Sequence, residues 1–166
     1  MPRITPAITG LRWLMVSAAI LSTVACGFQL RGNVAMSSQY STIRLQADPG
    51  SSFTKALIEQ LKANDVRISE TASIQLTIED DDTEVRNVSY NSRSKSAEKE
   101  IIRRVTFNVS DSKRQVTIVP SNQLQARRAY LYDDNKIAAM QEQEALIREE
   151  LAFDLATRLM LRLQKQ

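Results

Sequence analysis

Apolar and polar side chains alternate along several stretches of this chain, in the two-residue period of a β-strand with one buried face. The stretches with this period are residues 42–47, 74–78, 100–110, 115–119 and 124–132. Residues 83–93 contain only two aliphatic side chains and are expected to form the end of a strand followed by a loop. Pro120 is expected to end the fourth strand or to mark a sheet edge, since proline cannot donate to a ladder.

Two other segments have the period of an amphipathic helix. The first is predicted to begin at Ser51 or Ser52, either of which can cap it, and to run to Asn64. The second is predicted to begin after a cap at Asp133, Asp134 or Asn135 and to end near Leu163. Its leucines recur every four residues, so this helix needs an apolar surface such as a sheet face to cover its stripe.

This order of elements predicts an α+β fold, a two-layer sandwich with two helices on one face of a mixed, roughly four-stranded sheet. The sheet is expected to be mixed because one strand and one helix precede the antiparallel meander. We assign residues 42–166 to a single periplasmic domain. Residues 26–41 are small and polar without periodicity, and are expected to be a tether.

The N-terminal residues have the three-part organisation of a secretory signal peptide. Arg3 and Arg12 precede a run of twelve uncharged residues, 13–24, and small Ala25 follows. A membrane-spanning helix needs about 20 apolar residues, so this run is too short. We therefore predict that residues 1–25 are a signal peptide, in preference to a short membrane anchor or a buried core helix.

The only cysteine, Cys26, directly follows this run, and the stretch TVAC resembles the lipobox of bacterial lipoproteins. The resemblance implies a diacylglyceryl group on the sulfur, cleavage before Cys26 and an N-acyl chain such as palmitate, with no separate cofactor. Thr23 departs from the usual leucine. Several acyl chains hold a protein stably on a membrane, and Gly27, where inner-membrane lipoproteins carry Asp, implies sorting to the periplasmic side of the outer membrane.

Composition argues against an enzyme. The chain has no histidine, and its one cysteine is expected to carry lipid, so the commonest acid–base residue and the thiol nucleophile are lacking. There is no G-x-S-x-G, P-loop or dinucleotide-binding glycine motif. The acidic run at residues 79–84 could bind a hard cation, but such runs are usually solvated, and we predict no metal site.

Charge is nearly balanced once the signal peptide is removed. Two of the 22 Lys and Arg residues and none of the 19 Asp and Glu residues precede Cys26, which leaves a net charge of about +1. This balance gives no reason to expect nucleic-acid binding. The acidic residues 79–84 precede a basic segment, 86–104; the two could form a solvated, self-compensating loop, or the basic segment could bind an anionic ligand.

Four stretches together resemble the LptE family of lipopolysaccharide-assembly lipoproteins. They are CGFQLRG, FTKALIEQLKANDV, AEKEIIRRVTFNV and the long C-terminal segment that begins RAYLYDDN. The resemblance implies a two-helix, four-strand domain that plugs the lumen of the outer-membrane β-barrel LptD, assists its assembly, and helps deliver lipopolysaccharide to the outer leaflet. The alternative is a non-catalytic periplasmic scaffold or ligand-binding lipoprotein without a barrel partner.

The family is also reported to bind lipopolysaccharide, which suggests candidate residues. A basic position near the loop before the long middle strand is matched in place by Arg93 and Lys95. A second basic position falls on Met140 here, and the nearest basic residue is Lys136. Arg127 and Arg128 are a further candidate pair, because guanidinium groups pair well with phosphates. All five side chains could equally be solvated or pair with groups that line the barrel.

Overall fold

The computed structural model describes residues 38–90 and 96–165, all within one compact unit, residues 33–166. The predicted signal peptide, Cys26, most of the predicted tether, Arg93 and Lys95 lie outside the described residues. The described residues begin with a single 3-10 turn, Ser38–Tyr40. Tyr40 is fully buried in the core, so the folded unit includes the last residues of the segment predicted as a tether.

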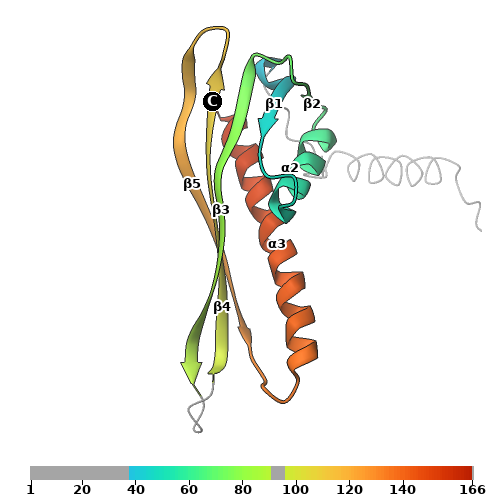
Figure 1. The fold of residues 1–166 in the computed structure, drawn as a ribbon, viewed down its shortest axis with the longest axis vertical. Coiled ribbons are helices and arrows are strands. Elements are labelled where there is room, and N and C mark those ends of the chain that lie inside the picture. Colours follow the sequence, from blue (N-terminus) through green and yellow to red (C-terminus); the bar gives the residue numbers. More distant parts are fainter. Residues whose placement is uncertain (1–37, 91–95, 166) are drawn as a thin grey trace, which may run out of the picture. The chain divides into compact units, whose positions relative to one another are not determined.

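The described chain forms a five-stranded mixed sheet and two long helices, which lie on the same side of the sheet (Figure 1). In chain order the elements are β1 (Thr42–Gln46), α2 (Ser52–Ala63), β2 (Arg67–Ile68), β3 (Ile74–Tyr90), β4 (Ser96–Asp111), β5 (Val116–Leu131) and α3 (Ile137–Gln164). The strand order is β2-β1-β3-β4-β5, with β1 parallel to β2 and β3 and the remaining pairs antiparallel. The predicted α+β class is confirmed. The sheet has five strands where about four were expected, since the two-residue β2 adds an edge.

Strand β3 is much longer than the alternation predicted. It continues from Ile78 through the acidic run to Tyr90, where a loop was expected after residue 83, and pairs with β4 along that length. Opposite charges directly across an antiparallel pair stabilise it, and Asp82 lies opposite Arg104. The pairing with basic residues of β4 therefore compensates for the poor strand propensity of aspartate.

Strand β5 is continuous through Pro120, so the prediction of two separate strands was wrong, whereas the alternative that Pro120 marks a sheet edge is confirmed. β5 is an edge strand, and its pairing with β4 is irregular between Phe107 and Val109, where Asn122 and Val119 are the partners. Proline is tolerated at such an edge or bulge because no ladder hydrogen bond is lost. The polar turn after Asp111 joins β4 to β5 as predicted, and Gln115 has a left-handed backbone there (φ 55°).

The core lies between the sheet and both helices. Ser51 caps α2 as predicted, accepting hydrogen bonds from the backbone N–H groups of Phe53 and Thr54. Buried residues of α3 follow the predicted stripe: Ile147, Leu151, Ala152, Leu155, Ala156, Leu159, Met160 and Leu163. They pack with Phe53, Leu57 and Leu61 of α2 and with alternate residues of β3 and β4.

The start of α3 differs from the expectation. The helix begins at Ile137, because Asp133 instead accepts hydrogen bonds from the backbone and side chain of Asn135 in a preceding turn. None of the first ten residues of α3 is buried. No helix of the described ranges is long and apolar enough to cross a membrane.

Candidate functional site

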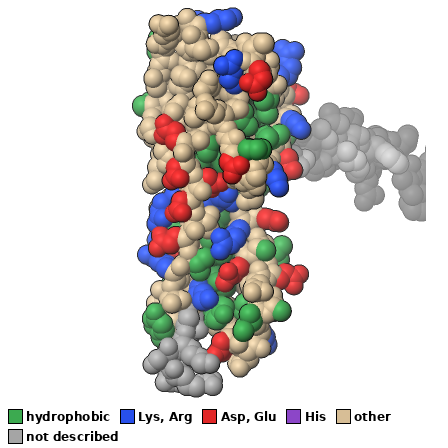
Figure 2. Space-filling model, in the orientation of Figure 1, with side chains coloured by type: hydrophobic (Ala, Val, Ile, Leu, Met, Phe, Trp, Pro, Cys, Tyr) green, Lys and Arg blue, Asp and Glu red, His purple; other side chains and the backbone are tan. Residues whose placement is uncertain are grey.

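Apolar side chains are exposed at the end of the sheet where the chain passes from β3 to β4 and from β5 to α3. We call this region, formed by residues 85–90, 131 and 137, the hairpin end. Its exposed fractions are 38% for Val85, 50% for Val88, 63% for Tyr90, 78% for Leu131 and 56% for Ile137. It lies at the bottom of Figure 1, and hydrophobic side chains are visible there in Figure 2. Clustered apolar surface of this kind marks an interaction site more often than isolated exposed residues do.

Two aromatic side chains hold the first part of α3 and the start of β4 in place beside this surface. The Tyr130 hydroxyl donates a hydrogen bond to Glu144 of α3. Burial, followed by the contact with the Glu144 carboxylate, raises the pKa of Tyr130, so it stays a neutral donor. The Lys99 ammonium lies 3.4 Å from the centre of the Tyr132 ring, in cation–π contact. The hairpin end is thus organised by a few polar contacts instead of a packed core.

Lys136, one of the predicted ligand-binding residues, lies at this end. It precedes the first turn of α3, and its side chain is 70% exposed. Its ammonium is 3.8 Å from the Asp133 carboxylate, a weak exposed ion pair. The structure therefore places one predicted basic residue at the hairpin end, free to exchange its intramolecular partner for an anion.

Arg127 and Arg128 point to opposite faces of β5. Arg128 faces the helices and pairs with Glu150 of α3 at 3.4 Å. Arg127 faces the outer side of the sheet, 3.9 Å from Glu100. Both side chains are about 60% exposed (60% and 64%), but as neighbours on a strand they cannot bind one ligand together on the same face.

The outer face of the sheet carries a ladder of cross-strand ion pairs. The Glu100 carboxylate forms an ion pair with the Arg86 guanidinium at 2.6 Å. The Arg104 guanidinium pairs with the carboxylates of Asp82 and Glu84 at 3.5 and 2.9 Å. The structure thus supports self-compensation of the acidic and basic segments, but on paired strands and not in a loop. The acidic run is split between two faces of β3, and no group of three or more metal-ligating side chains occurs in residues 38–90 and 96–165.

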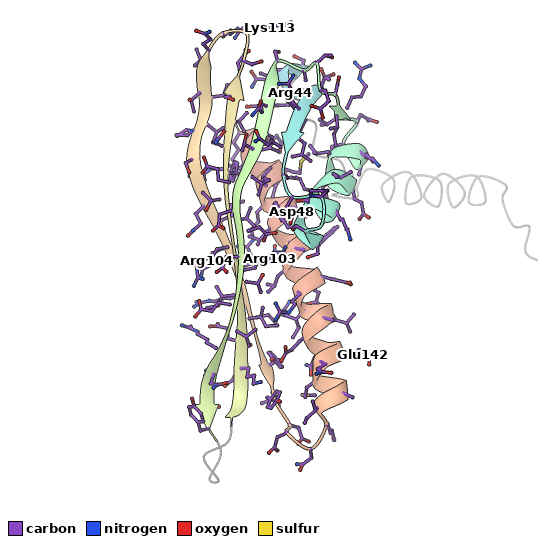
Figure 3. All side chains as sticks on the ribbon, in the orientation of Figure 1. Arg44, Asp48, Arg103, Arg104, Lys113 and Glu142 are labelled. Atoms are coloured by element: carbon purple, nitrogen blue, oxygen red, sulfur yellow. The ribbon has the colours of Figure 1, made fainter. Side chains whose placement is uncertain are left out.

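Arg103 is the functional-looking residue that the sequence did not single out. It occupies the inner row of β4 between Ile101 and Val105 and is only 5% exposed. Its guanidinium donates to both carboxylate oxygens of Asp81, at 2.8 and 2.7 Å, and Figure 3 shows it at mid-sheet, with Arg104 on the other face. The sequence signal that could have identified Arg103 is a charged residue among the apolar residues that alternate along β4.

The Arg103 guanidinium also joins the sheet to both helices. It donates to the hydroxyls of Ser52 and Ser51 at the start of α2, at 2.8 and 3.2 Å, and to the Arg148 carbonyl of α3 at 3.4 Å. Burial alone would raise the pKa of Asp81, but hydrogen bonds from Arg103 and Ser51 and the Arg103 charge lower it overall. With its donors satisfied inside the protein, this cluster is a structural junction.

Comparison with known proteins decides the family. A family described as LptE, lipopolysaccharide-assembly, matches residues 40–163. The chain belongs to the LptE family. The LPS-assembly lipoprotein LptE of Photorhabdus laumondii is 26% identical over 159 residues, which cover 90% of this chain and 83% of that protein. The LptE of Pectobacterium atrosepticum is 40% identical over 63 residues, 37% of this chain and 34% of that protein.

A solved structure agrees with this assignment. The crystal structure of the rare lipoprotein B from Shewanella oneidensis superposes with a TM-score of 0.62 at 26% identity, covering 73% of this chain and 92% of that one. As an LptE-family member the chain is a non-catalytic lipopolysaccharide-assembly lipoprotein, in agreement with the prediction that it is not an enzyme.

Proposed function

We propose that this LptE-family protein is lipidated on Cys26 after residues 1–25 are removed, and is anchored on the periplasmic side of the outer membrane. The residues between Cys26 and Ser38 would then connect the lipid to the folded domain, which includes the 3-10 turn Ser38–Tyr40. The TVAC motif and the lipoprotein relatives support this proposal. A Cys26→Ser variant that remains fully membrane-associated without a partner would contradict it.

We further propose that the domain binds an LptD-type outer-membrane β-barrel, plugs its lumen and assists its assembly. The observation that carries this proposal is the hairpin end, where apolar side chains 38–78% exposed are left uncovered by the described residues. The charged side chains on the outer face of the sheet are already ion-paired with one another. This face can therefore lie against the water-lined inner wall of a barrel without burying an unpaired charge.

The barrel proposal is tested by detergent extraction of tagged full-length protein and identification of co-purifying proteins by mass. The wild type is expected to bring down one large outer-membrane β-barrel in equal amount. Val88→Ser with Leu131→Ser should reduce that yield, because a polar side chain replaces apolar contact surface. Ile68→Ser with Val116→Ser is the matched control, since these residues are 39% and 53% exposed at the opposite end.

Two results would count against the barrel proposal. If wild-type protein that is folded and lipidated brings down no barrel, a scaffold or ligand-binding lipoprotein without a barrel partner is favoured. If both double variants lower the yield equally, the hairpin end is not the contact surface.

Lipopolysaccharide binding is proposed for the same end. Arg93, Lys95 and Lys136, with Arg127 or Arg128 on its own face of β5, would pair with phosphates. The neighbouring Val88, Tyr90 and Leu131 would touch acyl chains. The combination of cations and apolar surface matches a ligand that presents both phosphates and hydrocarbon.

Binding is measured at low salt, where screening is weakest. Arg93→Glu with Lys95→Glu should weaken lipopolysaccharide affinity by about tenfold or more, through lost charge-assisted contacts. Lys55→Glu with Arg148→Glu makes the same charge change on the two helices and should have little effect. Unchanged affinity in the first variant would exclude the loop as the binding site.

A further inference from the structure

The end of the domain opposite the hairpin end gathers basic side chains from four separate segments. We call it the basic end; its residues are Lys62 of α2, Arg67 of β2, Lys113 in the turn between β4 and β5, and Arg162 and Lys165 at the end of α3. Strand pairing places these segments together, since β2 pairs with the start of β1 and Ile74 at the start of β3 lies opposite Asp111. Lys113 and the C-terminal end of α3 lie at the same end in Figures 3 and 1.

These five basic side chains are exposed and have no ion-pair partner among the residues described. Basic residues elsewhere are mostly paired: Arg86, Arg103, Arg104, Arg127, Arg128, Lys136 and Arg158 each contact a carboxylate. The contrast shows that the positive charge at the basic end is not used within the described fold.

Few acidic groups offset this charge. Asp111 accepts hydrogen bonds from the backbone N–H groups of Lys113 and Arg114 and lies 3.6 Å from the Arg114 guanidinium. Glu70 lies 3.8 Å from Arg44. Asp65 is the remaining carboxylate in the α2–β2 connection, so the end presents an excess of positive charge that attracts an anionic surface.

Apolar side chains are exposed beside these cations. Val116 follows the β4–β5 turn and is 53% exposed, and Ile68 of β2 is 39% exposed. Cations interspersed with isolated apolar side chains suit the headgroup region of a bilayer, where both kinds of group find partners.

The described chain also begins at this end. The backbone N–H of Ser41 donates a hydrogen bond to the Ser38 carbonyl at 3.3 Å, and the N–H of Arg67 donates to the Ser41 carbonyl at 3.0 Å. Eleven residues lie between Cys26 and Ser38, a length that spans at most roughly 40 Å. A lipid on Cys26 would therefore keep the basic end within reach of the bilayer.

We propose that in the free lipoprotein the basic end docks on an anionic phospholipid surface and leaves the hairpin end exposed to an incoming partner. This inference rests on the lipidation of Cys26 proposed above. The lipid by itself limits only the distance between the domain and the membrane. Electrostatic docking would also set the orientation of the domain on the membrane.

The test uses purified, lipidated full-length protein in vesicles without a barrel. Because the Cys26 sulfur carries lipid, a cysteine introduced as Thr117→Cys, beside Val116, is the only thiol that a fluorophore can label. Energy transfer to an acceptor-labelled lipid then reports how close the basic end lies to the membrane. A second labelled protein, Gln141→Cys, reports the hairpin side of α3.

The expected result is stronger transfer from residue 117 in phosphatidylcholine vesicles that contain phosphatidylglycerol than in phosphatidylcholine alone, with loss of the difference at high salt. Lys113→Gln, Arg162→Gln and Lys165→Gln together should lower the ratio of docked to undocked protein by on the order of a hundredfold, at about fivefold for each charge. Lys55→Gln, Arg104→Gln and Arg148→Gln together are the charge-matched control, at residues outside both the basic end and the proposed lipopolysaccharide site, and should leave transfer unchanged.

Each other outcome overturns the inference. Equal transfer in neutral and anionic vesicles, or equal effects of the two triple variants, would exclude docking by the basic end while the anchor stands. A response to lipopolysaccharide but not to phosphatidylglycerol would assign this end to a different ligand. Protein that fails to float with any vesicle would overturn the Cys26 anchor, and this inference with it.

Discussion

The half of the domain around α2 and the half that ends in the hairpin share the same three long strands but are built differently. Near α2, both helices cover the inner face of the sheet, and Phe53, Leu57 and Leu155 are fully buried. Toward the hairpin end only the start of α3 runs beside the sheet, and Val88 and Leu131 are 50% and 78% exposed. The difference separates stability from recognition: one half buries its apolar surface within the chain, whereas the other leaves it for a partner.

Arg103 lies between the two halves, and its removal is the strongest test of the comparison. Arg103→Ala should lower the free energy of unfolding by about 4 kcal/mol, because it leaves the Asp81 carboxylate, with a side chain only 15% exposed, without its cation. Urea unfolding of the mature protein measures the change. Arg103→Met with Asp81→Leu should recover most of the loss; a loss below about 1 kcal/mol in the single variant would show that the junction is dispensable.

Two leucines of α3 test the comparison on a single helix. Leu155→Ala should cost about 3 kcal/mol, since Leu155 is fully buried and its truncation leaves a cavity. Leu146→Ala, at a position 58% exposed, should cost about 0.5 kcal/mol or less. Thermal or urea unfolding gives both values. Equal costs would mean that the start of α3 is packed as tightly as its end.

Acid titration tests whether the Arg103–Asp81 junction acts through charge. The pKa of Asp81 is lowered in the folded protein, so its contribution is present above the unfolded value of about 4 and is lost as pH falls through the lower folded pKa. The stability difference between wild type and Asp81→Asn should therefore be largest near neutral pH and shrink on acidification. A stability difference that stays constant on acidification would show that the junction does not act through charge.

The smallest effect is expected at the hairpin end itself. Val88→Ser should change the free energy of unfolding by only about 0.5 kcal/mol, because the residue is half exposed. The same variant should bind less of a dye that reports exposed apolar surface. A loss above about 1 kcal/mol would show that this end is part of the stabilising core, which would remove the distinction drawn above.

Local sequence patterns predicted the elements of the first half well. Ser51 as a cap, the stripes of α2 and α3, and the inner row of β4 from Ile101 to Val109 all follow from periodicity, because burial on one face imposes that period. The same method missed the continuation of β3 through residues 79–90 and divided β5 into two strands, although the alternative that Pro120 marks a sheet edge is confirmed. There the strand is stabilised by cross-strand charges on β4 and by a position at the sheet edge, neither of which is visible within a short window of sequence.

The candidate site divides in the same way. Among the candidate binding residues, Lys136, the basic residue nearest to the matched family position, lies at the hairpin end. The further candidates Arg127 and Arg128 lie on opposite faces of β5. The role of Arg103 could not be predicted, because its partners come from β3, α2 and α3 and are distant in sequence.

The sequence by itself determined the class of fold, the family resemblance and the expectation of a lipid anchor, because signal, cap and periodicity are local properties of the chain. Only the tertiary structure decided which charged side chains form ion pairs within the protein and which remain unpaired among the described residues. The acidic run and the basic segment neutralise each other across β3 and β4. Lys113 and Arg162, from segments far apart in the sequence, lie at one end of the domain without an ion-pair partner among residues 38–90 and 96–165. Ion pairing depends on distances between side chains, and those distances are fixed by strand register and helix packing.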